Sequence, residues 1–91
     1  MEVSHTIELT NLYGLHARSS SLLAQTAQQF KASIRLGRLG NNDEVDAKSI
    51  LALLTLGASK GQALLIRASG EDAEKAVAAL TELIGKNFGA E

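Results

Sequence analysis

Residues 62–86, with the sequence QALLIRASGEDAEKAVAALTELIGK, contain the pattern that decides the fold class. Their first part, residues 62–69, alternates with a period of two, which predicts a half-buried strand. Its inward face consists of Leu64, Ile66 and Ala68. The second part has apolar residues at helical spacing and predicts a helix from about Glu71 to Lys86. Its apolar stripe consists of Ala73, Ala76, Val77, Leu80, Leu83 and Ile84. Between the two parts, Ser69 and Asp72 match a capping box, which we expect to open the helix.

The segments before this stretch add further strands. Residues 2–9 alternate in the same way, with one side made of Val3, His5, Ile7 and Leu9. We interpret His5 as a histidine at the edge of the core rather than as a catalytic one. A second strand is predicted over residues 32–36, with Ile34 and Leu36 inward. A short third strand is expected near Leu39 or at residues 44–45.

Two more helices are expected. The first runs from about Ala17 to Phe30, and its exposed face is polar but uncharged, with Gln25, Gln28 and Gln29. The second is short and lies between Asp46 and Gly57. Either Asp46 or Ser49 could cap its start, and Gly57 suits a left-handed end. The order of elements is β-α-β-β-α-β-α, which predicts an α+β fold with an open antiparallel sheet and helices on one face.

Composition excludes several classes of protein. The chain has 91 residues, a net charge of −1 and no Cys or Pro, so one domain spanning residues 1–91 is expected, without a disulfide scaffold or a thiolate zinc site. The near-zero charge argues against a nucleic-acid partner. The longest apolar run, residues 50–54, is too short to cross a membrane. The N-terminus does not resemble a secretory signal, so a cytoplasmic location is expected.

Residues 14–20, with the sequence GLHARSS, contain the sharpest functional signal. His16 directly precedes a predicted helix, and the unpaired N–H groups at its start, those of Ala17, Arg18 and Ser19, attract anions. Arg18 adds a permanent cation. A neutral imidazole beside such an anion site could accept and release a phosphoryl group. The alternative is a histidine that caps the helix beside a solvated arginine.

A second signal surrounds Ser49, which lies near a helix start where a phosphate would be tolerated. It could equally be a capping serine followed by core leucines. A short helix cannot bury all of the apolar run that follows, so some of Ile50, Leu51 and Leu54 should be exposed for a partner to dock on. The sequence has no metal-ligand spacing, phosphate-binding glycine loop or nucleophile elbow, so we expect neither a metal, a cofactor nor an independent enzyme.

The motifs at residues 14–18 and 47–51, with those at 55–57, 59–61 and 68–77, resemble the HPr family, histidine-containing phosphocarriers of the bacterial sugar phosphotransferase system. The resemblance covers essentially the whole chain and implies an open-faced β-sandwich of four antiparallel strands with three helices. It implies that His16 takes a phosphoryl group on Nδ1 from enzyme I, charged by phosphoenolpyruvate, and passes it to enzyme IIA. Arg18 would assist, and Ser49 would match the serine that an HPr kinase/phosphorylase modifies in many members. The surface of Ile50, Leu51 and Leu54 resembles the docking patch.

Three features depart from that family. Ser19 stands where the family usually has proline, and Gln25, Gln28 and Gln29 stand where lysines are frequent, which predicts weaker pairing with a standard enzyme I. The connection over residues 37–43 is about two residues longer than usual. Besides a carrier, a monomer by expectation, the sequence leaves open a regulatory interaction module that acts through Ser49. A small ligand-binding domain is a third reading.

Overall fold

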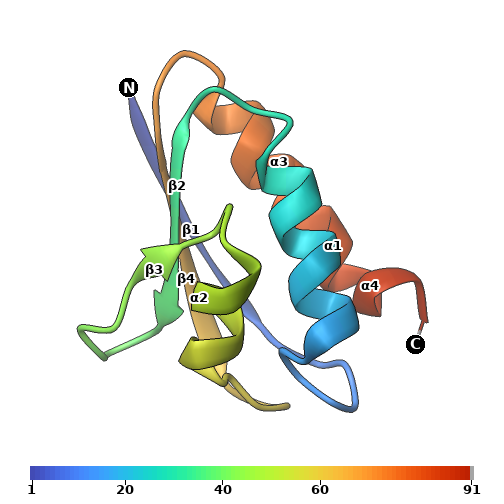
Figure 1. The fold of residues 1–91 in the computed structure, drawn as a ribbon. Coiled ribbons are helices and arrows are strands. Elements are labelled where there is room, and N and C mark those ends of the chain that lie inside the picture. The colour runs from blue at the N-terminus through green and yellow to red at the C-terminus, as the bar shows by residue number, and fades with distance from the viewer. Residues whose placement is uncertain (91) are drawn as a thin grey trace.

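The computed structural model describes residues 1–90 and has a four-stranded sheet beside a layer of helices (Figure 1). The strands are β1 (Glu2–Glu8), β2 (Ser33–Arg38), β3 (Val45–Asp46) and β4 (Ala63–Ser69). The helices are α1 (Ala17–Ala27), α2 (Ile50–Leu56), α3 (Ala73–Gly85) and the terminal turn α4 (Asn87–Ala90). The strand order is β1-β4-β2-β3 and each neighbouring pair is antiparallel. The predicted α+β class is therefore confirmed.

The core lies between the sheet and the helices, which share one side of it (Figure 1). Strand β4 is central, and its residue Ile66 lies opposite His5 of β1 and Leu36 of β2. The predicted inward residues of β2 and β4 are all buried. Helix α3 buries its predicted stripe except for Leu83, which is half-buried. The alternating residues of the strands leave the other face of the sheet to solvent, as the period of two requires.

Two helix boundaries differ from the prediction. Helix α1 ends at Ala27 rather than at Phe30, because the N–H groups of residues 29 and 30 bond three residues back and turn the chain toward β2. Helix α2 begins at Ile50, because Asp46 belongs to β3, where it pairs with Arg35. The same pairing places the third strand at residues 45–46 rather than at Leu39. The alternative cap, Ser49, and the left-handed Gly57 are both confirmed.

The predicted capping box at α3 is wrong. The helix begins at Ala73 and its N-cap is Asp72, whose carboxylate does not bond to the helix. Oδ2 accepts the N–H of Lys31 and Oδ1 that of Ala32, each at 2.8 Å. Asp72 thus ties the chain between α1 and β2 to the start of α3. The carboxylate accepts these two distant backbone N–H groups instead of an N–H of its own helix.

The C-terminal turn α4 was not foreseen, whereas His5 lies at the edge of the core, as expected. In α4, Asn87 and Phe88 have positive φ values of 53° and 55°, so the chain reverses its handedness after α3 and buries the Phe88 ring at 1% exposure. His5 shares a side of β1 with Val3 and Ile7, but it is exposed, because β1 forms the edge of the sheet. Among residues 1–90, no helix is both long and apolar enough to cross a membrane.

Candidate functional site

The loop between β1 and α1 depends on Gly14. Its φ of 60° lies in the left-handed region that favours glycine. A Cβ at this position would lie 2.5 Å from the carbonyl oxygen of Ala58, so a side chain would force the backbone to move. Leu15 donates its N–H to the same oxygen at 2.9 Å. The loop is therefore held against the chain that leads from α2 to β4.

Two side chains converge on the carbonyl oxygen of Gly14. Asn11 Nδ2 donates to it at 2.8 Å, and Ser19 Oγ donates at 2.7 Å. Asn11 and Ser19 are only 2% and 0% exposed, so water does not compete for these bonds. Sequence reasoning missed both roles. The only signal was a polar residue before a glycine, which by itself indicates no more than a turn.

His16 is the N-cap residue of α1, with an extended backbone at φ −124° and ψ −172°. Its carbonyl accepts the first helical N–H, from Ser20, at 2.8 Å. A reciprocal capping box holds it: Ser19 Oγ accepts the His16 N–H at 3.0 Å, and the His16 side chain faces the backbone N–H of Ser19. The His16 side chain is half-buried, and the Tyr13 ring meets it edge-on with centroids 5.7 Å apart.

Arg18 is anchored by a residue from the opposite end of the chain. Its Nη2 donates to the carbonyl oxygen of Phe88 at 3.1 Å, and Phe88 is itself fixed by its buried ring. No local pattern joins residues 18 and 88, because the contact depends on the left-handed turn of α4. This bond fixes the position of the guanidinium at the start of α1.

These residues place an exposed helix start beside a histidine, which makes a candidate anion site. Ala17 and Arg18 are exposed at the start of α1, where backbone N–H groups carry the positive end of the helix dipole. The imidazole of His16 lies at the same helix start, because His16 is the residue directly before α1. Such an arrangement can hold the oxygens of a phosphoryl group near a ring nitrogen. Within residues 1–90, no three His, Cys, Asp or Glu side chains are grouped so as to hold a metal ion.

The second sequence signal lies at the start of α2 rather than at this site. Ser49 is the N-cap of α2, and its Oγ accepts the N–H of Ala52 at 3.1 Å. The apolar residues after it divide as expected: Leu53 is buried, whereas Ile50, Leu51 and Leu54 are 40%, 74% and 39% exposed. A hydrogen bond from Gln28 of α1 to the carbonyl of Lys48, at 2.9 Å, connects the two helices.

Comparison with known proteins matches this fold and site. The PTS-HPr family, described as the PTS HPr component phosphorylation site, matches residues 3–86. The phosphocarrier protein HPr of Neisseria meningitidis serogroup A is 40% identical over 87 residues, which cover 96% of both chains. The phosphocarrier protein NPr of Escherichia coli K12 is 38% identical over 88 residues, 97% of both. The crystal structure of HPr from Thermoanaerobacter tengcongensis superposes with a TM-score of 0.92 at 42% identity, over 98% of each chain.

The fold is the α+β open-faced sandwich of these structures, and it defines the chain as a small phosphocarrier. The chain belongs to the HPr family of the phosphotransferase system. Membership implies that it interacts with enzyme I and enzyme IIA, between which the family carries phosphoryl groups.

Proposed function

We propose that His16 is the phosphoryl acceptor of this carrier, which takes the group from phosphorylated enzyme I and gives it to enzyme IIA. The observation that carries the proposal is the position of the ring, half-buried at the N-cap of α1 beside exposed helix N–H groups. In the transfer, the lone pair of a neutral His16 Nδ1 forms a bond to phosphorus. The bond between phosphorus and enzyme I breaks, and its electron pair stays with enzyme I.

The negative charge of the bound phosphoryl group is balanced by this chain's own groups. The N–H groups of Ala17 and Arg18 face it from the helix start, and the Arg18 guanidinium supplies a full positive charge. Ser19 contributes through its backbone and through its hydroxyl, which holds His16 in place. The second transfer, to enzyme IIA, reverses the same bonding changes.

The chain acts as a carrier without turnover of its own, as a monomeric unit spanning residues 1–91 in the cytoplasm. Two proteins must reach one histidine in turn, which requires an open site rather than a closed pocket. The exposed, uncharged Gln25 and Gln28, which lie toward the end of α1, give little electrostatic steering toward an acidic enzyme I.

Phosphotransfer from enzyme I and phosphoenolpyruvate tests the proposal. Wild-type protein should gain one acid-labile phosphate, detected by mass and by phosphorus NMR, and His16→Ala should gain none. His5→Ala is the matched control, because it removes the other histidine of the chain, which is exposed on β1. Acid-labile phosphate on His16→Ala, or its loss in His5→Ala, would overturn the assignment.

A second proposed function is regulation at Ser49. The observation that favours it is the pairing of a helix-capping hydroxyl with the exposed apolar surface of Ile50, Leu51 and Leu54. A phosphate there would keep an oxygen for the N–H of Ala52 and would suit the helix dipole, while adding charge to a docking surface. Incubation with an HPr kinase/phosphorylase and ATP should label wild-type protein and Ser59→Ala, a variant at an exposed serine, but not Ser49→Ala. Equal labelling of all three would contradict it.

A further inference from the structure

Three consecutive residues of α4 have a left-handed backbone. The φ values of Asn87, Phe88 and Gly89 are 53°, 55° and 84°. Glycine adopts this conformation freely and asparagine tolerates it, but for a bulky residue such as Phe88 it is unfavourable. A strained backbone persists only where the surrounding structure holds it, and such residues cluster at functional sites. The contacts of α4 show what this conformation supports.

The turn α4 contacts both ends of the segment that carries the histidine. Before the histidine, Thr10 Oγ1 donates to Asn87 Oδ1 at 2.6 Å. After it, Arg18 Nη2 donates to the carbonyl oxygen of Phe88 at 3.1 Å. The Phe88 ring belongs to the core and is 1% exposed, so it fixes the backbone that both bonds depend on. Figure 1 shows α4 beside the N-terminal half of α1. The turn therefore clamps the segment of residues 10–18.

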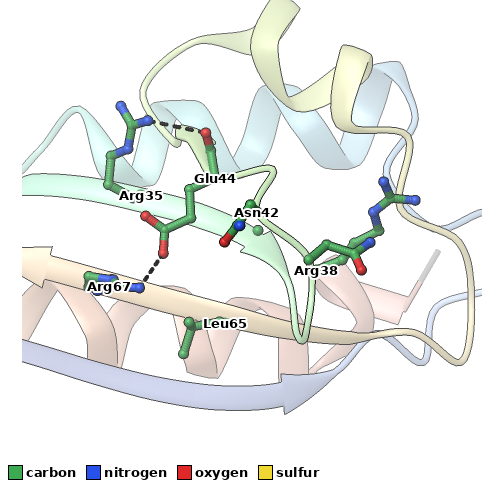
Figure 2. Close-up of a pocket in the computed structure, with 8 residues that line it drawn as sticks. Arg35, Arg38, Asn42, Glu44, Leu65 and Arg67 are labelled. Atoms are coloured by element: carbon green, nitrogen blue, oxygen red, sulfur yellow. Dashed lines mark hydrogen bonds and ion pairs between the residues drawn. The ribbon is translucent and has the colours of Figure 1, made fainter.

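The Phe88 carbonyl holds a guanidinium by a neutral acceptor, which differs from the way another arginine of the chain is held. In the pocket between the sheet and the hairpin of residues 39–44, Arg67 Nη2 bonds to Glu44 Oε2 at 2.6 Å (Figure 2). A carboxylate in this position neutralises the cation and occupies donors that a phosphate oxygen would need. A carbonyl orients the guanidinium without that neutralisation, which suits a cation that must meet a phosphoryl group.

We propose that α4 positions Arg18 for phosphoryl transfer, with Phe88 as the positioning residue and Asn87 as a second tie to the segment of His16. The proposal rests on the proposed function, because it concerns the cation beside the same phosphoryl group. An arginine side chain has many rotamers, and one that is already held in place loses less entropy when the group arrives. The family model matches residues 3–86, so its pattern does not include α4.

Single-turnover transfer from phosphorylated enzyme I to the full chain, over a range of carrier concentrations, tests this proposal. Phe88→Ala removes the ring that fixes the carbonyl, so the rate at saturation should fall by about tenfold, while the half-saturating concentration should change little. Asn87→Gly keeps a residue that accepts a positive φ and removes the bond from Thr10, so it should give a smaller fall. Thr10→Val removes the other partner of that bond and should match Asn87→Gly.

Two comparisons separate positioning from a loss of stability. Val77→Ala truncates a buried side chain of α3 beside the groove between α3 and β1, so it should destabilise the fold in urea and leave the transfer rate at the wild-type value. Arg18→Gln should slow the transfer, and adding Phe88→Ala should slow it no further, because both changes act through one guanidinium. Asn87→Gly and Thr10→Val leave the core intact, so they test the clamp even if Phe88→Ala does not fold.

Three results would overturn the proposal. Equal falls in rate for Val77→Ala and Phe88→Ala would leave α4 with a stabilising role alone. Effects of Arg18→Gln and Phe88→Ala that multiply would mean that Phe88 does not act through Arg18, and wild-type rates in every α4 variant would remove the clamp. Each variant should still gain acid-labile phosphate on His16 in a long incubation. Its absence from wild-type protein would contradict the proposed function instead.

Discussion

Helices α1 and α2 both begin after an N-cap residue with an extended backbone, but different side chains satisfy the backbone N–H groups at the two starts. At α2 the N-cap side chain does the capping, because Ser49 Oγ accepts the N–H of Ala52. At α1 a serine three residues into the helix, Ser19, takes the N–H of the N-cap residue. The difference teaches that the Ser49 hydroxyl alone closes the α2 start, whereas at α1 Ser19 holds the backbone of His16 in a reciprocal capping box.

The contacts that hold the starts of α1 and α2 in place differ as well. The α1 start is braced by Gly14, which lies against Ala58, and by two buried side chains on the Gly14 carbonyl. The α2 start is held by Lys48 instead, whose carbonyl accepts from Gln28 and whose Nζ donates to the Phe30 carbonyl, and it leads into exposed apolar residues. A rigid start suits repeated transfer of a small group, and an apolar one suits contact with a protein.

Among these changes, replacement of Gly14 should destabilise the start of α1 most strongly. Gly14→Ala places a Cβ in contact with the Ala58 carbonyl, so we expect a loss of about 2–4 kcal/mol in unfolding free energy, measured by urea denaturation, and slower phosphorylation of His16. Gly61→Ala is the control. It also has a positive φ, of 92°, but its Cβ would meet nothing within 4 Å, so it should cost only about 1 kcal/mol. Equal losses in the two variants would exclude the clash as the cause.

The role of Ser19 can be separated from its burial. Ser19→Ala removes the bonds to Gly14 and His16, so it should cost about 1–2 kcal/mol and slow the transfer from enzyme I. Ser20→Ala is a matched control, because Ser20 is as buried as Ser19 but its hydroxyl has no partner within residues 1–90. It should leave stability the same or higher. A transfer rate unchanged by Ser19→Ala would mean that the brace does not position the histidine.

At α2 the corresponding change should affect the fold and not the chemistry. Ser49→Ala should lower the unfolding free energy by about 1 kcal/mol, the usual cost of losing a cap. The rate of His16 phosphorylation should stay at the wild-type value, and stopped-flow measurements with enzyme I compare the two. A decrease similar to that of Ser19→Ala would erase the distinction between the two helix starts.

Asp72, the N-cap of α3, extends the comparison to a third helix start, and its replacement should have the smallest effect on stability. The hydrogen bond from the Lys31 N–H lowers the pKa of the Asp72 carboxyl below the ordinary 3.8. Partial burial acts in the opposite direction, and the hydrogen bond from the Ala32 N–H lowers the pKa further. A carboxyl with a lowered pKa stabilises the fold above its ordinary value, and that contribution is lost as the pH falls through the lowered one. Asp72→Asn should therefore weaken the pH dependence of stability below about pH 4, measured by urea unfolding, relative to wild type and Glu74→Gln. Identical slopes for all three would contradict this.

Strands β1, β2 and β4 were predictable because each has one face toward the core, which imposes an alternation that residues such as Leu64 and Ile66 display directly. The start of α1 at Ala17 was predictable because a helix start is a local feature. Asp72 was misassigned because its partners lie about forty residues earlier in the chain, where no spacing rule applies. Phe88 was missed because a left-handed backbone at an aromatic residue has no sequence signature.

The bond between Arg18 and Phe88 also bears on the order in which the protein is made. Translation delivers the histidine and the arginine within the first twenty residues, but the carbonyl that anchors the arginine comes seventy residues later. A chain that ends before residue 88 can form α1 and still lack this anchor. The anchor forms only after the segment that follows α3 has left the ribosome, so an interrupted chain would carry His16 without a positioned Arg18.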